Sequence, residues 1–308
     1  MVCLSAASCD AASDVVNNIK DTVIGEGLSV KENPEAPDRD NTPQILAEEA
    51  TGTATFGGDG CTVDYSNASD GYILIAYEGT NPKVKVQIKA EGNDPYTYDL
   101  VRNAGFQAFP LSMGSGTYEV GVFTNVSGDQ YAQAAKQTIT AEIADEFSPF
   151  LHANQYSNFT GASACVSKAQ AELSGVKTDL GATERIYKYV VDNIVYDYEE
   201  AATVQSGYIP DPDLTLSTGK GICFDYASLT TAMLRSQGIP CKLVVGYAGT
   251  AYHAWISVYS RETGKVMSII NFSQDQWNRM DPTFTASGDR ADPNVVGDGT
   301  TYNPIYYY

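Results

Sequence analysis

The spacing of apolar residues changes near residue 146, and this change restricts the folds that the chain can adopt. Between residues 46 and 145, β-forming residues fall in short runs with glycine- and asparagine-rich turns between them. The runs lie at 72–77, 84–88, 96–98 and 118–123. Short strands of alternating polarity with frequent turns are typical of a β-sandwich of the immunoglobulin-like kind. We therefore expect residues 46–145 to form an all-β domain.

Beyond Pro149 the apolar residues recur at helical spacing instead. The clearest case lies between 182 and 194, where one face carries Ile186, Tyr187, Val190, Val191 and Ile194. Such a face is the signature of an amphipathic helix packed on a core. Further helices are expected at 163–173 and 223–236, and strands at 242–247, 253–259 and 266–272. Residues 146–308 are thus predicted to form an α+β domain.

Residues 1–45 fit neither pattern. They are acidic and polar and are broken by Pro34, Pro37 and Pro43. Such a composition predicts a leader and linker rather than a packed domain. Cys9, which follows Ala6-Ala7-Ser8, shares part of the pattern of a bacterial lipobox. A lipid anchor at Cys9 and an unstructured leader are the two alternatives for this segment.

The charge balance excludes several classes of partner. The 308 residues contain 38 Asp and Glu but 19 Lys and Arg, a formal charge of −19. This charge would repel phosphate backbones and anionic membranes, so nucleic acid is not an expected partner. The chain contains no apolar run of about 18 residues, so no transmembrane segment is predicted. The polar, acidic composition favours a secreted or cell-surface protein.

Six scattered cysteines, with no Cys-x-x-Cys pair, predict neither a zinc site nor a disulfide framework. No metal or cofactor is expected. Cys223 differs from the other five because it follows the glycine-containing turn 219–222 and opens a predicted helix. A helix N-terminus stabilises a thiolate, and the Cys223 backbone N–H could donate to a substrate oxyanion. The alternative is a buried apolar thiol.

A nucleophilic cysteine needs a base, and the chain has two histidines, His152 and His253. His152 has no motif around it, and a structural or exposed role is expected for it. His253 lies in a predicted strand that places His253 and Trp255 on one face. Asp281, which precedes a proline, is suited to fix the imidazole tautomer.

Three segments resemble the transglutaminase-like superfamily in their order and in their residues: 219–240 (GKGICFDYASLTTAMLRSQGIP), 252–255 (YHAW) and 280–283 (MDPT). They are similar in particular to exported bacterial proteins that join a β-sandwich to such a domain. The resemblance covers roughly 150–308 and implies a papain-like core. The interval between His253 and Asp281 is longer than in the shortest family members, which predicts an extra hairpin near Gly264 and a strand before Trp277.

The resemblance implies that Cys223 is the nucleophile, His253 the base and Asp281 the orienting acid. The implied reaction is acyl transfer from a peptide or a glutamine carboxamide through a thioester, which water or an amine resolves. Peptides, proteins and cell-wall peptides are the expected substrates. The superfamily also includes inactive modules, so the alternative is a catalytically silent module for surface adhesion or cell-wall binding.

Further residues are expected around this site. Trp255 could wall the pocket or fill the core, and Tyr226 could contact substrate from the first turn of the helix. Asp225 suits the helix dipole better than a catalytic role. A second oxyanion donor is expected upstream of the helix, with Gln205, Tyr198 and Tyr208 as unranked candidates.

Overall fold

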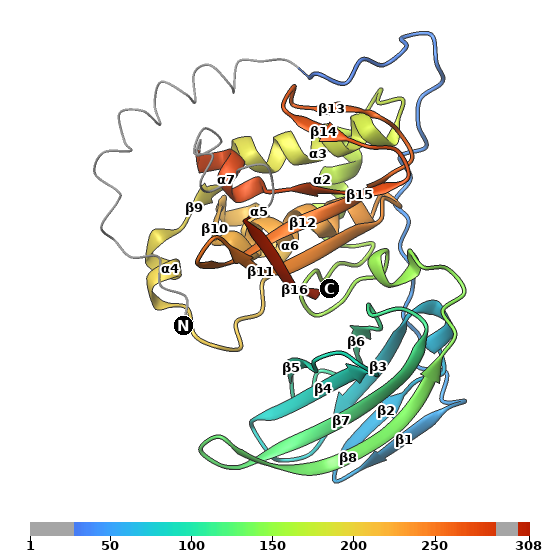
Figure 1. Ribbon diagram of the computed structural model, residues 1–308, viewed down its shortest axis with the longest axis vertical. Coiled ribbons are helices and arrows are strands. Elements are labelled where there is room, and N and C mark those ends of the chain that lie inside the picture. The colour runs from blue at the N-terminus through green and yellow to red at the C-terminus, as the bar shows by residue number, and fades with distance from the viewer. Residues whose placement is uncertain (1–27, 288–300) are drawn as a thin grey trace. The chain divides into compact units, whose positions relative to one another are not determined.

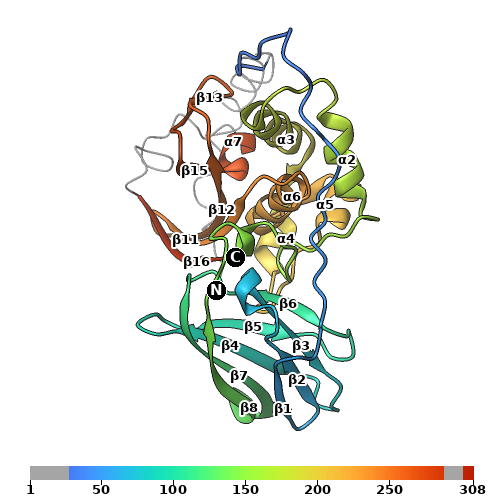
Figure 2. The same ribbon diagram turned by 90° about the vertical axis from the view of Figure 1, so that its right-hand side faces the viewer.

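A computed structural model describes residues 28–287 and 301–308, which form two compact units (Figures 1 and 2). One unit comprises residues up to 45 together with 156–307, and the other comprises 46–155 together with Tyr308. The predicted leader, including Cys9, lies outside the described residues. Within the described part of the chain, no helix is long and apolar enough to cross a bilayer.

The unit of residues 46–155 is built from two four-stranded antiparallel sheets. The first has the order β1 (Thr55–Gly58), β2 (Cys61–Asp64), β3 (Tyr72–Tyr77), β6 (Gln107–Pro110). The second has the order β5 (Tyr96–Leu100), β4 (Val84–Ala90), β7 (Gly116–Ser127), β8 (Gln130–Ala141). Short 3-10 turns cover Ala68–Asp70 and Ser148–Phe150.

Alternation along the strands explains why the two sheets pack on each other. In β4, Val84, Val86 and Ile88 are buried, whereas the side chains between them are more exposed. Tyr98 of one sheet meets Phe109 of the other edge to face, with ring centroids 5.0 Å apart. The unit is therefore a β-sandwich whose core lies between the sheets, as the strand pattern predicts.

The other unit is an α+β domain around a four-stranded antiparallel sheet. The sheet has the order β15 (Gln276–Met280), β12 (Ala251–Ser260), β11 (Cys241–Ala248), β16 (Tyr302–Tyr307). The helices α2 (Ala164–Glu172), α3 (Asp179–Asn193), α5 (Pro212–Thr218) and α6 (Cys223–Arg235) gather on one side of this sheet (Figure 2). Helices α4 (Tyr198–Thr203) and α7 (Pro282–Ser287) are short.

Two smaller strand pairs complete the α+β unit. β9 (Val195–Tyr196) and β10 (Lys220–Gly221) pair in parallel. β13 (Gly264–Val266) and β14 (Ile270–Phe272) form the antiparallel hairpin that is predicted near Gly264, whereas the apolar pattern predicts a single strand at 266–272. Met267 and Ser268 both have positive φ, so the chain turns between the two strands.

Among the described helices of this unit, α6 is the most deeply buried, and its ends follow from local chemistry. At the N-terminus the Asp225 carboxylate accepts a hydrogen bond from the Ile222 backbone N–H at 2.8 Å. At the C-terminus Gly238 adopts a left-handed conformation (φ +71°), which glycine tolerates without strain. Arg235 is fully buried, and its guanidinium donates to the Cys241 carbonyl at 2.7 and 2.9 Å. These contacts tie α6 to β11.

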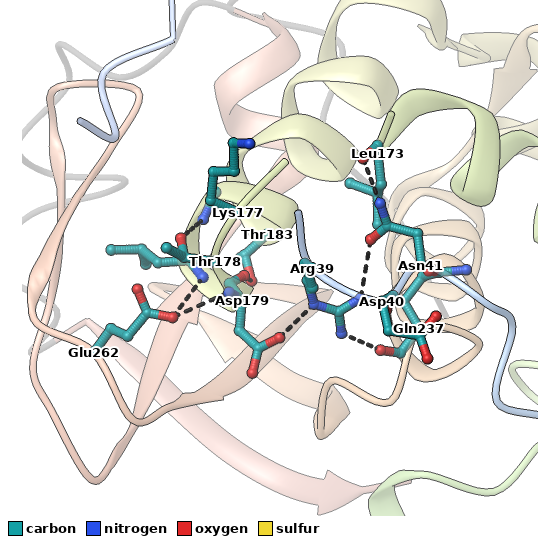
Figure 3. Close-up of polar contacts among 12 residues, drawn as sticks. Arg39, Asp40, Asn41, Leu173, Lys177, Thr178, Asp179, Thr183, Gln237 and Glu262 are labelled. Atoms are coloured by element: carbon teal, nitrogen blue, oxygen red, sulfur yellow. Dashed lines mark hydrogen bonds and ion pairs between the residues drawn. The ribbon is translucent and has the colours of Figure 1, made fainter. Parts of the chain in front are cut away.

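Residues 28–45 are not a free linker, although their composition predicts one. They lack regular secondary structure, but their polar side chains bind α2, α3 and the loop after α6. Arg39 lies between the Asp179 carboxylate and the Gln237 carbonyl, and Asn41 donates to the Leu173 carbonyl at 2.5 Å (Figure 3). The contacts join residues more than 100 positions apart, so nothing in the local sequence reveals them. We call residues 28–45 the strap.

Candidate active site

Cys223 is the first residue of α6 and is more accessible than the other described cysteines. Ile222 before it is extended, and Cys223 begins the helical turn. Its side chain is half-buried, whereas Cys61, Cys165 and Cys241 are buried. The first N–H groups of a helix have no intrahelical acceptor, so the thiol lies in the positive field of the α6 N-terminus.

The turn before Cys223 is more ordered than the sequence predicts. Gly219 ends α5 in a left-handed conformation, and Lys220 and Gly221 then form strand β10. A Cβ at Gly221 would lie 2.5 Å from the Cβ of Asp225, so glycine is required there for steric reasons. The nucleophile candidate therefore follows a strand that is held by backbone pairing.

His253 and Asp281 are in direct contact. Nε2 of His253, on β12, lies 2.7 Å from Oδ2 of Asp281, and both residues are buried. Asp281 lies between β15 and α7, where its Oδ1 accepts the Phe284 backbone N–H at 3.1 Å. Its Oδ2 also accepts the Tyr302 hydroxyl at 2.8 Å. Two further donors thus hold the carboxylate against the imidazole.

The second partner of the His253 side chain is Cys223. Nε2 is engaged by Asp281, so Nδ1 is the nitrogen available to the thiol. Burial by itself would lower the pKa of His253, but the charge of Asp281 and the hydrogen bonds to Asp281 and Cys223 outweigh it and raise the pKa. The protonated ring is therefore favoured, as a thiolate–imidazolium pair requires.

Aromatic rings fix the plane of the imidazole. The Phe284 ring stacks on His253 with centroids 4.4 Å apart and an interplanar angle of 18°. Trp255 lies nearly parallel to the imidazole at 6.2 Å and meets Tyr302 edge to face at 5.0 Å. Trp255 is only 3% exposed, so of the two roles expected for it the structure favours packing.

Tyr226 also lies in the core. It is 1% exposed, and its hydroxyl donates to the Ile194 carbonyl at 2.5 Å. This position leaves its ring no surface to offer a substrate, in contrast to the expectation from the sequence. A tyrosine that follows the nucleophile by three positions on a buried helix points inward with the helix's apolar face.

The three expected oxyanion donors are placed differently from one another. Gln205 is exposed, and its amide donates to the Thr203 carbonyl at 2.7 Å. Tyr198 is 68% exposed, and its ring meets that of Tyr196 edge to face at 5.0 Å. The Tyr208 hydroxyl donates to Oδ1 of Asp225 at 2.8 Å.

Asp225 is a buried cap of α6, as the sequence favours. Its two oxygens accept the Ile222 N–H and the Tyr208 hydroxyl. Burial raises the pKa of Asp225 to about 6, with the Glu200 charge adding to the shift and these two hydrogen bonds opposing it. Asp225 therefore changes charge within the range where such an enzyme would work.

Tyr302 and Phe284 contribute to the site but are absent from the sequence-based expectations. Tyr302 reaches Asp281 because β16 pairs with β11, with Tyr302 opposite Ala248. That pairing joins positions more than 50 residues apart, and a single sequence contains no signal for it. A signal for Phe284 did exist, because Asp281-Pro282 is a common start of a helix and predicts that the next turn packs nearby.

Residues 167–282 match the transglutaminase-like superfamily. The UPF0252 protein MJ1282 of Methanocaldococcus jannaschii is 38% identical over 87 residues, which cover 24% of this chain and 25% of that protein. The matched part is thus about a quarter of the relative's length.

Two solved structures are similar at lower identity. A candidate cysteine protease from Cytophaga hutchinsonii has a TM-score of 0.40 at 15% identity, covering 82% of this chain and 78% of that one. Red sea bream transglutaminase has a TM-score of 0.30 at 13% identity, covering 83% of this chain and 53% of that one. The family assignment rests on residues 167–282.

Proposed function

Because residues 167–282 of this chain form a domain of the transglutaminase-like superfamily, we propose that the protein is a cysteine-dependent acyl-transfer enzyme. Cys223 is the nucleophile, His253 the general base and Asp281 the residue that orients the base. One observation carries the proposal: the imidazole that interacts with the thiol at the start of α6 is held at Nε2 by a buried carboxylate.

The geometry supports a two-step reaction. The Cys223 thiolate adds to the carbonyl carbon of a peptide or glutamine carboxamide, and the carbonyl electrons move to oxygen. The oxyanion then collapses and breaks the C–N bond while the His253 imidazolium gives its proton to the leaving nitrogen. The products of this step are ammonia or an amine and a thioester on Cys223.

The second step decides the class of enzyme. Neutral His253 takes a proton from water or from a primary amine, which attacks the thioester and releases the thiolate. Water gives hydrolysis or deamidation, and an amine gives transamidation. Asp281 keeps the imidazole in the tautomer and plane that both steps use.

The reaction is tested with a peptide library that contains glutamine peptides and cell-wall stem peptides, incubated with and without cadaverine. Mass spectrometry separates three products: cleaved peptide, deamidated peptide and cadaverine adduct. The wild-type protein should form one of them, and Cys223→Ala should form none. Product that persists in Cys223→Ala, or no product above that control, would contradict the proposed function.

Export is the second part of the proposal, and it is supported by the acidic, polar composition. Fractionation of cells that express the full chain should find the protein outside the cytoplasm. A lipid anchor at Cys9 would be recognised by incorporation of labelled palmitate, which Cys9→Ser should abolish. Recovery of the unlabelled protein from the cytoplasm would contradict export.

A further inference from the structure

Strand β9 brings Tyr196 next to the nucleophile. β9 and β10 pair in parallel, with Tyr196 opposite Gly221, two residues before Cys223. The Asp197 backbone N–H donates to the Gly221 carbonyl at 3.0 Å, and the Val195 N–H donates to the Gly219 carbonyl at 2.8 Å. These two hydrogen bonds fix the backbone on both sides of Tyr196 relative to the start of α6.

The Tyr196 hydroxyl is close enough to the site to interact with its charged groups. The ring is half-buried, and the hydroxyl interacts electrostatically with Cys223, Tyr198 and Asp225. Burial, followed by these charges, raises the pKa of Tyr196. The phenol is therefore neutral at pH 7 and has its proton to donate.

This hydroxyl has no protein partner among residues 28–287 and 301–308. The ring has one, because it meets Tyr198 edge to face at 5.0 Å. Half-buried hydroxyls in folded proteins normally find a partner in the protein or in water. A phenol that is held rigidly beside a thiol and keeps its donor unused by the protein is prepared to bind something that enters the site.

The donors expected from the sequence are less suitable. The Gln205 amide is exposed and used by the Thr203 carbonyl, and the Tyr208 hydroxyl is used by Asp225. Tyr198 is on the exposed side of the pair that it forms with Tyr196. Tyr196 combines proximity to Cys223, a fixed backbone and an available proton.

We propose that the Tyr196 hydroxyl is the second donor of the oxyanion hole, opposite the backbone N–H of Cys223. This inference rests on the proposed function. The phenol donates a hydrogen bond to the carbonyl oxygen as that oxygen becomes negative, and no proton is transferred to it. The hydrogen bond strengthens as the charge develops, so it stabilises the transition state more than the bound substrate.

The test compares two reagents at the same thiol. Acylation by p-nitrophenyl acetate passes through a tetrahedral oxyanion, whereas alkylation by iodoacetamide displaces iodide and forms none. Tyr196→Phe removes one oxygen and keeps the ring. It should slow acylation about 100-fold, the usual effect of losing one oxyanion donor. The alkylation rate and its pH profile should stay unchanged.

Tyr198→Phe is the matched control, because it makes the same change on the neighbouring, exposed ring, and both of its rates should equal those of the wild type. The rate measured for Cys223→Ala is the background from the other thiols, and it is subtracted from every other rate. Equal losses of acylation and alkylation in Tyr196→Phe would overturn the inference, because they indicate support of the thiolate or of the fold. Unchanged acylation would overturn it as well.

A failure of the proposed function would look different. In that case the wild-type protein itself would show no acylation above Cys223→Ala, before any tyrosine is changed. A melting temperature of Tyr196→Phe within a few degrees of the wild type confirms that the rates compare folded proteins. If the variant is less stable, the ratio of the two rates still decides, because both reagents report on the same molecules.

Discussion

Tyr302 donates a hydrogen bond to Asp281 at 2.8 Å, and it does so to the same oxygen that meets the His253 imidazole. The tyrosine comes from β16, the last strand of the chain, whereas Asp281 comes from the loop between β15 and α7. The orientation of the imidazole therefore depends on a strand that is remote from the three candidate catalytic residues in sequence.

Removing the Tyr302 hydroxyl should loosen Asp281. A hydrogen bond to a charged group contributes about 1.5–3 kcal/mol, so we expect Tyr302→Phe to lower the free energy of unfolding by about 2 kcal/mol. Turnover should fall with little change in KM, because Asp281 acts through His253 and does not touch substrate. Chemical denaturation and steady-state kinetics measure the two effects. Tyr307→Phe on the same strand is the control, and an equal loss of turnover in that variant would contradict a specific role for Tyr302.

Cys223 should react with iodoacetamide faster than any buried thiol of the chain. Cys241 is completely buried, and burial raises the pKa of its thiol to about 11. Thiolates rather than thiols are the nucleophiles, so we expect alkylation at Cys223 to exceed that at Cys241 by about 100-fold or more. Peptide mapping by mass spectrometry assigns each adduct to its cysteine. Similar rates at the two positions would show that Cys223 is not activated.

Asp225 should make stability depend on pH. Its pKa is about 6 in the folded protein against 3.8 for the ordinary side chain. A raised carboxyl pKa contributes stability that is present at acidic pH and is lost as the pH rises through about 6. The Asp225→Asn variant lacks this pH-dependent contribution to the unfolding free energy. The unfolding free energy of wild type minus that of the variant should therefore fall by roughly 2 kcal/mol between about pH 4 and about pH 7.5.

Asp213 provides a control of opposite sign. Burial opposes ionisation of this residue, but the backbone N–H groups of Cys165 and Ala164 outweigh burial and lower its pKa. Asp213→Asn should therefore lose more stability at neutral than at acidic pH. Urea denaturation of the wild type and both variants across this pH range makes the measurement. Parallel pH profiles for the two variants would contradict the assignment of the Asp225 charge.

Local patterns predicted the parts of the fold that depend on a single buried face. The strand at 72–77 and the start of α6 at Cys223 have the bounds expected from the sequence. Both are determined by neighbouring residues: a run of β-formers in one case, and a turn followed by helical spacing in the other. The convergence of Cys223, His253 and Asp281 was expected from a resemblance, which carries long-range information that periodicity lacks.

Most structural features that the sequence does not predict arise from pairing between distant segments. β9 and β10 have two residues each, too few for any periodic signal, yet they place Tyr196 opposite Gly221, two residues before Cys223. Helix α5 differs from that pairing, because its start lies in the local sequence: Asp211 caps it by accepting the Asp213 and Leu214 N–H groups, with Pro212 in the first turn. That start signal is readable from the sequence, whereas the β9–β10 pairing is not.

Glu184 should hold the strap to the α+β unit. This glutamate of α3 is 1% exposed, and its carboxylate accepts the backbone N–H groups of Ser29, Val30 and Met267 at 2.6–2.9 Å. Every donor points at a carboxylate oxygen. In Glu184→Gln an NH2 group replaces one of these oxygens, and it cannot accept the hydrogen bond of the donor that faces it. An unsatisfied buried donor costs about 1–3 kcal/mol. We therefore expect the variant to lose about 2 kcal/mol of unfolding free energy, an amount typical of such a loss.

The strap should also become accessible in this variant. Limited proteolysis should cleave Glu184→Gln within residues 28–45 at a protease concentration that leaves the wild type intact, because release of Ser29 and Val30 frees the start of the strap. Glu35→Gln is the matched control, since Glu35 is an exposed residue of the strap itself. If both variants are cleaved at the same rate, the Glu184 contacts do not fasten the strap. Protection of 28–45 together with normal stability in Glu184→Gln would show that Arg39 and Asn41 are sufficient to hold it.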